Sequence, residues 1–117
     1  MKPETRILHN PRCSKSRQTL ALLEEQAETP LIIEYLKTPP SIEELTDIIT
    51  KLNISARDLM RKGEAEYKEL NLADANLSEA QLIEAMHNNP RLIERPIVIK
   101  NDKVAIGRPP ENVLSIL

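Results

Sequence analysis

The chain has 117 residues, of which 40% are hydrophobic and 29% charged, and its formal net charge is −2. This size and composition are typical of a single globular domain with a substantial core. The negative charge argues against nucleic-acid binding, which requires a basic surface. The sequence lacks both an apolar run of the ~20 residues that span a membrane and a secretory signal pattern. The single cysteine excludes an internal disulfide and fits a reducing cytoplasm.

The first 40 residues predict a strand, a helix and a second strand. Residues 5–9 form the first strand, and the helical spacing of Leu20, Leu23 and Ala27 predicts a helix that ends near Ala27. The β-branched run 31–35 predicts the second strand. This order indicates a parallel βαβ unit.

Residues of about 41–90 are predicted to be helical. The tetrapeptides 41–44 and 78–81 are Ser-x-x-Glu and Ser-x-x-Gln, the pattern of capping boxes that begin helices. A shorter helix is expected over 56–61, with Gly63 at its C-terminal end. The apolar stripe of the first helix is Ile42, Leu45, Ile48, Ile49 and Leu52.

The last part of the chain predicts a β-hairpin and a helix. Strands at 96–100 and 103–106 flank an Asn-Asp turn, and Pro110 lies where a final helix begins. The whole order predicts an α/β fold with a mixed central sheet and an inserted helical segment.

Cys13 lies between the first strand and the first helix, where backbone N–H groups are unpaired and carry partial positive charge. The side chains of Arg12, Lys15 and Arg17 add full positive charges. Such surroundings lower the pKa of a cysteine from about 8.5 toward roughly 3.5–7.5. Cys13 is therefore predicted to be a nucleophilic thiolate at neutral pH. The alternative is a buried and inert thiol, which the charged flanking residues fit poorly.

The final hairpin places two arginines together. With a two-residue turn at 101–102, Lys100 pairs with Lys103, and the same register puts Arg95 opposite Arg108. Like charges facing each other across a sheet are destabilising, but a bound oxyanion would match both guanidinium groups. Because most arginines are solvated surface residues, the spacing alone leaves both interpretations open.

Other templates fit less well. Cys13, His9 and His87 are too few for a zinc site and lack the spacing of zinc ligands, so no metal site is expected. The loop around Cys13 contains none of the glycines that phosphate-binding loops require.

Taken together, these residues resemble the glutaredoxin-coupled arsenate reductases of the ArsC family, over essentially the whole chain. The segment 9–13 followed by Ser16 and Arg17 resembles the catalytic loop of that family. The segments 59–62, 94–98 and 107–109 resemble the segments that carry the family's three oxyanion-binding arginines, which would here be Arg61, Arg95 and Arg108.

The resemblance implies a thioredoxin-like fold, with a core of about 4–40 and 91–117 and a helical insertion of about 41–90. It implies that the Cys13 thiolate attacks arsenate or a similar oxyanion, and that Pro96 is a cis-proline facing the cysteine. No bound cofactor is implied. Glutathione is the implied co-substrate and glutaredoxin the implied recycling partner.

The remaining loop residues receive supporting roles from the same resemblance. His9 and Ser16 are implied to tune or contact the thiolate, and Asn10 and Arg17 belong to the same loop. The alternative for His9 is a histidine at a strand end that bonds to a backbone group.

Two other functions remain open. Cys13 and Ser16 form the Cys-x-x-Ser pattern of a monothiol oxidoreductase. The same fold also resembles Spx-like redox regulators that bind RNA polymerase, but those sense oxidants through a Cys-x-x-Cys pair. Because the second position is Ser16, this chain cannot form such a disulfide switch.

Overall fold

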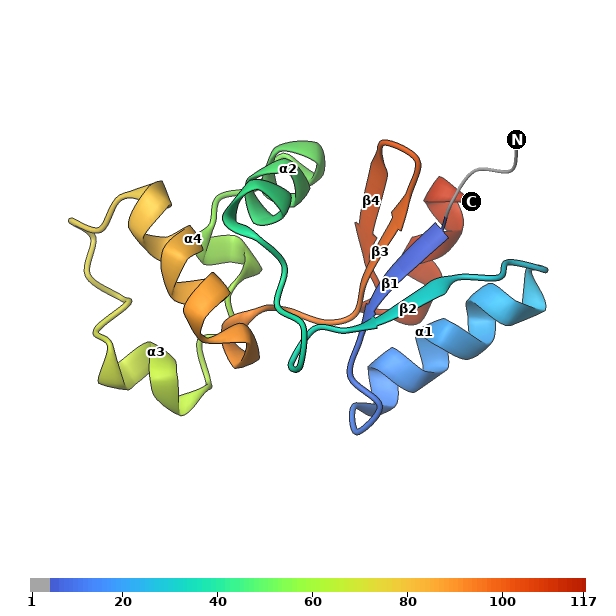
Figure 1. The fold of residues 1–117 in the computed structure, drawn as a ribbon, viewed down its shortest axis with the longest axis horizontal. Coiled ribbons are helices and arrows are strands. Elements are labelled where there is room, and N and C mark those ends of the chain that lie inside the picture. The colour runs from blue at the N-terminus through green and yellow to red at the C-terminus, as the bar shows by residue number, and fades with distance from the viewer. Residues whose placement is uncertain (1–4) are drawn as a thin grey trace. The chain divides into compact units, whose positions relative to one another are not determined.

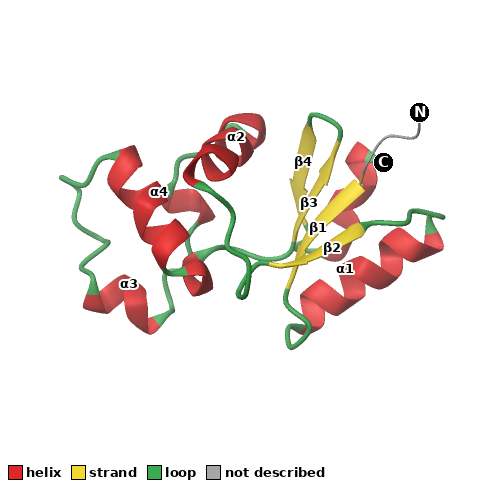
Figure 2. Cartoon of the chain, viewed as in Figure 1, coloured by secondary structure: helices red, strands yellow, loops and turns green. Residues whose placement is uncertain are grey.

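The computed structural model describes residues 5–117, which divide into two compact units. The sheet unit comprises the described residues up to Thr38 together with Arg95–Leu117, and the helical unit comprises Pro39–Glu94. The named strands of the described residues all belong to the sheet unit (Figure 2). The predicted start of the core at residue 4 lies outside the described residues. Among residues 5–117, no helix is long and apolar enough to cross a membrane.

Within residues 5–117, four strands form a mixed sheet in the order β2-β1-β3-β4 (Figure 1). The strands are β1 (Thr5–His9), β2 (Leu31–Glu34), β3 (Ile97–Lys100) and β4 (Lys103–Ile106). β1 and β2 are parallel, and β3 is antiparallel to both β1 and β4. The predicted βαβ unit, hairpin and mixed sheet are therefore confirmed.

One face of this sheet is covered by α1 (Ser14–Glu25) and by the 3-10 helix η3 (Pro110–Ile116). The buried cluster on this face is aliphatic. Every element of the sheet unit except β2 contributes one residue to it: Ile7, Leu23, Val98, Ala105 and Val113. Each fully buried aliphatic side chain stabilises the fold by roughly 1.5–3 kcal/mol relative to its exposed state. This packing holds the second half of α1 against the sheet.

The end of α1 differs from the prediction. The helix ends at Glu25, and Ala27 is exposed with a left-handed backbone (φ 60). The N–H of Ala27 donates to the carbonyl of Glu24, and the N–H of Glu28 donates to that of Leu23. These two bonds form a Schellman motif, which usually has glycine in the left-handed position. The alanine in that position concealed the helix end in the sequence.

The helical unit contains α2 (Ile42–Leu52), α3 (Ala65–Glu69), α4 (Glu79–Asn88) and the short 3-10 helices η1 (Arg57–Leu59) and η2 (Pro90–Leu92). Both predicted capping boxes are present, at the starts of α2 and α4. Leu45, Ile48 and Ile49 are buried as predicted, whereas Ile42 at the start of the stripe is largely exposed.

The helix predicted over 56–61 is wrong beyond its first turn. The chain becomes extended at Met60 because this segment forms an antiparallel bridge with Ile93. The N–H of Arg61 donates to the carbonyl of Leu92 at 2.7 Å, which supplies the partner that a helix would otherwise provide. Gly63 therefore does not end a helix, and its backbone is not left-handed.

Candidate active site

Cys13 occupies the N-cap position of α1, as its sequence position predicted. The loop that leads to it is shaped by Asn10, whose side-chain oxygen accepts from the N–H of Arg12 and whose carbonyl accepts from the N–H of Cys13, both at 3.0 Å. These bonds close a tight turn between the end of β1 and the start of the helix. The sulfur therefore lies where the first N–H groups of α1 lack helical partners.

The environment of Cys13 favours the thiolate. Burial raises the pKa of the thiol, but hydrogen bonds from the backbone of Ser16, the side chain of Arg95 and the backbone of Lys15 outweigh it, so the pKa lies below the ordinary value. The positive charge of Arg95 acts in the same direction. Because the thiolate is the reactive form of cysteine, this site supplies a nucleophile.

The source of the positive charge differs from the expectation. We expected the side chains of Arg12, Lys15 and Arg17 to stabilise the thiolate, but the cationic side chain that lowers the pKa of Cys13 is that of Arg95. Lys15 acts through its backbone N–H, and the guanidinium of Arg17 donates to the carbonyl of Pro11 at 2.9 Å. Arg17 thus holds the loop from the solvent side.

Ser16 connects the loop to the end of β1. Its hydroxyl is completely buried, lies 2.6 Å from Nδ1 of His9 and accepts from the N–H of Asn10 at 3.0 Å. Burial lowers the pKa of His9, with Glu34 opposing this effect and Arg17 adding to it. His9 is therefore a neutral imidazole near pH 7. The backbone of Ser16 contacts Cys13, while its hydroxyl is bonded to His9 and Asn10.

The hairpin register agrees with the prediction and places two arginines together. Lys100 pairs with Lys103, and beyond the ladder the N–H of Gly107 donates to the carbonyl of Pro96 at 2.9 Å. Nε of Arg108 then donates to the carbonyl of Arg95 at 2.8 Å.

The two arginines meet at the cysteine. Nη2 of Arg108 lies 3.6 Å from Sγ of Cys13, and the side chain of Arg95 also bonds to this sulfur. The Arg95–Pro96 peptide bond is cis, the geometry that the resemblance implies, and so is the Arg108–Pro109 bond. Two guanidinium groups and a thiolate form a cluster that can hold an oxyanion beside a nucleophile.

Arg61 belongs to the helical unit and already has acidic partners there. Its Nη1 donates to Glu94 at 3.0 Å, and its Nε lies 3.9 Å from a carboxylate oxygen of Glu64. Neither carboxylate was predicted from the sequence. Glu64 had a local signal, because it follows Arg61 by three residues, whereas Glu94 comes from a remote segment and had none. The oxyanion-binding role of Arg61 stays a prediction.

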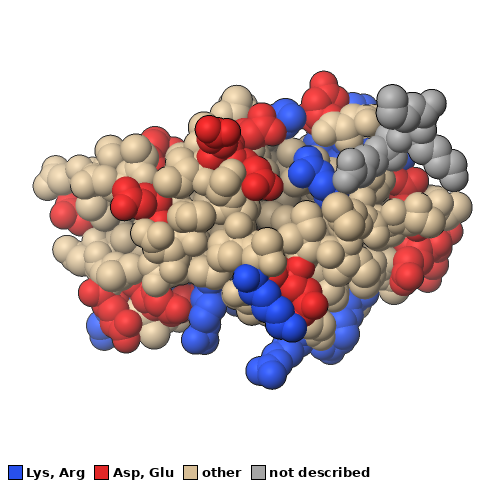
Figure 3. Space-filling model, in the orientation of Figure 1, with Lys and Arg blue, Asp and Glu red and all other residues tan. Residues whose placement is uncertain are grey.

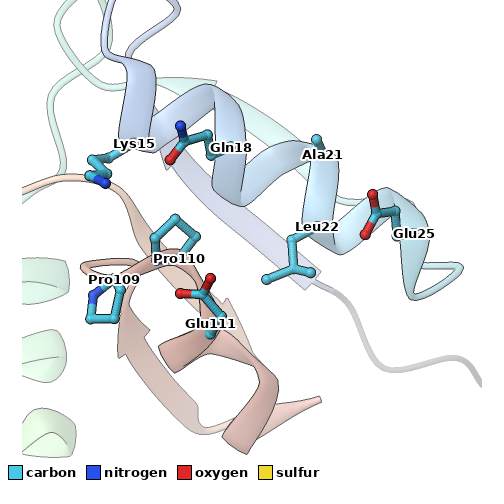
Figure 4. A pocket seen from close by; sticks show the side chains of 8 residues that line it. All are labelled: Lys15, Gln18, Ala21, Leu22, Glu25, Pro109, Pro110 and Glu111. Carbon is cyan, nitrogen blue, oxygen red and sulfur yellow. The ribbon is translucent and has the colours of Figure 1, made fainter.

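A groove of about 420 Å³ lies between α1 and the start of η3 (Figure 4). Lys15, Gln18 and Leu22 line it from the helix, and Pro109, Pro110 and Glu111 line it from the other side. Cys13, Arg95 and Arg108 are not among its lining residues.

Basic and acidic side chains are interspersed on the face shown in Figure 3. In residues 5–117, no three His, Cys, Asp or Glu side chains are grouped to hold a metal ion.

Similarity to known proteins extends over nearly the whole chain. A family model described as the ArsC family matches residues 8–116. The chain is 55% identical over 118 residues to the Escherichia coli K12 protein named "Uncharacterized protein YfgD", covering 100% of this chain and 99% of that protein. It is 50% identical over 116 residues to an arsenate reductase of Neisseria meningitidis serogroup A, covering 98% and 99% of the two chains.

Among solved structures, an arsenate reductase from Vibrio cholerae is similar over 100% of both chains, with a TM-score of 0.96 and 52% sequence identity. The mixed sheet with α1 and η3 on one face therefore has the thioredoxin-like fold of this family, as the resemblance implies.

Proposed function

Because the chain belongs to the ArsC family, we propose that it is an oxidoreductase that reduces arsenate to arsenite through Cys13. The single observation that carries this proposal is the contact of Cys13 with two guanidinium groups at the N-cap of α1. This arrangement suits an anionic guest and a thiolate nucleophile. The choice of arsenate is supported by relatives named arsenate reductases, which are 50–52% identical to this chain over nearly its full length.

In the proposed first step, the Cys13 thiolate attacks As(V), a sulfur–arsenic bond forms, and one arsenate oxygen leaves as water after protonation. Arg95 and Arg108 neutralise charge on the remaining oxygens, which is the usual electrostatic contribution to such a step. We assign Arg61 the same role as a third guanidinium, on the strength of the resemblance.

In the second step, arsenic gains two electrons. An external thiol attacks the sulfur of the adduct, so a mixed disulfide with Cys13 forms and arsenite leaves as As(III). The chain has one cysteine and cannot supply this thiol itself. We propose glutathione as the co-substrate and glutaredoxin as the protein that reduces the mixed disulfide, in the reducing cytoplasm where both thiols are kept reduced.

The test is arsenite production by the purified protein with arsenate, glutathione and glutaredoxin. Arsenite should form with the wild-type chain and not with Cys13→Ser, and omission of either thiol component should stop turnover. Arsenite no higher than with Cys13→Ser would contradict the proposal. Reduction of a glutathione mixed disulfide without arsenate would instead support a monothiol oxidoreductase, and stable binding of RNA polymerase would support a regulator.

A further inference from the structure

Gly107 lies in a space that admits no side chain. A Cβ atom built on it would lie 2.5 Å from Oγ1 and 2.9 Å from Cγ2 of Thr19, and 2.8 Å from Cγ of Pro96. Real Cβ atoms do not approach neighbours this closely, so a segment would have to move. Because the backbone of Gly107 is not left-handed, glycine is required here for space and not for its conformational freedom.

The atoms around Gly107 cannot move easily. Thr19 is completely buried in α1, and its hydroxyl donates to the carbonyl of Lys15 at 2.8 Å and lies 3.4 Å from that of Gly107. β-branched side chains have few allowed rotamers in a helix. The side chain of Pro96 is a closed ring that can change only its pucker, and the carbonyl of Pro96 accepts from the N–H of Gly107. The close approach is therefore set by backbone and constrained side chains.

This contact joins the elements that build the thiolate site. Thr19 lies on the helix that carries Cys13 at its N-cap. Gly107 directly precedes Arg108, and Pro96 directly follows Arg95. All six residues belong to the sheet unit. A displacement of the Gly107 backbone from α1 would thus move both arginine-bearing segments relative to the sulfur.

We propose that Thr19 and Gly107 are positioning residues, whose close contact sets the distance between the Cys13 sulfur and the guanidinium groups of Arg95 and Arg108. Neither residue contacts the reacting atoms. The contact leaves no room for a side chain between α1 and the backbone of Gly107. A single methyl group added at Gly107 is therefore enough to move Arg95 and Arg108 away from the sulfur of Cys13. The readout with arsenate rests on the proposed function, whereas the titration of Cys13 does not.

The test is the substitution Gly107→Ala, measured by the pH dependence of Cys13 alkylation. The midpoint of the alkylation profile should shift upward, because the arginines that favour the thiolate are displaced. Gly63→Ala is the matched control, because a Cβ on Gly63 meets nothing within 4 Å. An unchanged midpoint in a folded Gly107→Ala protein would overturn the proposal.

Removal of the opposing side chain should restore the site. Thr19→Ala removes two of the three close contacts, so the Thr19→Ala/Gly107→Ala protein should titrate closer to wild type than Gly107→Ala does. If Gly107→Ala does not fold, the double variant is compared with Thr19→Ala alone, and close agreement of their midpoints supports the spacer. A double variant with a midpoint as high as an unperturbed cysteine would overturn it.

Anion binding gives a second readout. The arsenate concentration that half-protects Cys13 from alkylation should rise about tenfold in Gly107→Ala, since charge-assisted hydrogen bonds are weakened. If arsenate protects neither the wild-type protein nor Gly107→Ala but the midpoint of the alkylation profile shifts, arsenate is rejected as the substrate while the positioning role stands. If arsenate protects both proteins equally and the midpoints agree, the positioning role fails.

Discussion

Nη2 of Arg108 lies 3.6 Å from the sulfur of Cys13, at the long end of a hydrogen bond to sulfur. Arg95, in contrast, lowers the pKa of Cys13 both by a hydrogen bond and by its charge. We therefore expect Arg95 to contribute more to the stability of the thiolate than Arg108 does. Arg108 is also held by its own Nε, which donates to the carbonyl of Arg95.

We expect Arg95→Gln to slow alkylation of Cys13 at neutral pH by about tenfold, because it removes the main charged partner of the thiolate. Arg108→Gln should slow it less. The lowered pKa of Cys13 in the folded state adds stability that is lost as the pH falls through that pKa. Arg95→Gln should therefore also reduce the pH dependence of the free energy of unfolding in this range. Equal effects of the two substitutions would contradict the assignment.

The hydroxyl of Ser16 is predicted to support the loop and not the charge on Cys13. Ser16→Ala leaves the buried N–H of Asn10 without its partner and should destabilise the fold by about 1–3 kcal/mol. The alkylation profile of Cys13 should keep its lowered midpoint, because the backbone N–H of Ser16 remains. Chemical denaturation and alkylation measure these two effects separately. Ser115→Ala, at an exposed position, is the control.

A midpoint that returns to the ordinary cysteine value in Ser16→Ala would show that the hydroxyl acts on the thiolate itself. The experiment therefore separates two roles that the sequence could not distinguish, since both predict a polar residue three positions after Cys13.

His9 is expected to make the protein less stable in acid. Because burial lowers the pKa of His9, the unfolded chain takes up the proton first, and stability falls as pH drops below about 6.5. This contribution cannot exceed about 1.4 kcal/mol per pH unit for one proton. Denaturation curves between about pH 8 and pH 5 should show a smaller loss for His9→Gln than for wild type. Parallel stability profiles would contradict a neutral buried imidazole.

Local patterns predicted those parts of the site that depend on neighbours in sequence. The N-cap position of Cys13 was predictable because the spacing of apolar residues changes from that of a strand to that of a helix at this point. The pairing of Lys100 with Lys103 was predictable from the two-residue turn. This register was enough to bring Arg95 and Arg108 together.

Features that depend on segments remote in sequence were not predictable. The Thr19–Gly107 contact joins positions 88 residues apart, and nothing local marks Gly107 as a close approach. The helix expected over 56–61 failed for the same reason, since the backbone partner at Ile93 comes from another segment. Thr19 had a weak signal, because Ser16, Thr19 and Leu23 share one buried helical face.

Glu94 is predicted to weaken oxyanion binding by neutralising Arg61. The carboxylate lies 3.0 Å from Nη1 of Arg61, so under the role proposed above for Arg61 an oxyanion would compete with this carboxylate. Glu94→Gln removes the charge and keeps an oxygen that can accept from Arg61. Since the pair is partly exposed, its removal is worth up to about 1 kcal/mol, and the affinity for arsenate should increase about three- to fivefold.

Calorimetric titration of arsenate into the Cys13→Ser protein, with and without Glu94→Gln, measures this effect without turnover. Glu64→Gln is the matched control and should have less effect, because its carboxylate oxygen is 3.9 Å from Nε of Arg61. The increase in arsenate affinity should vanish when Arg61→Gln is combined with Glu94→Gln, because the positive charge that Glu94 neutralises is then absent. Weaker binding in Glu94→Gln would instead show that Glu94 orients Arg61 for the anion through its charge.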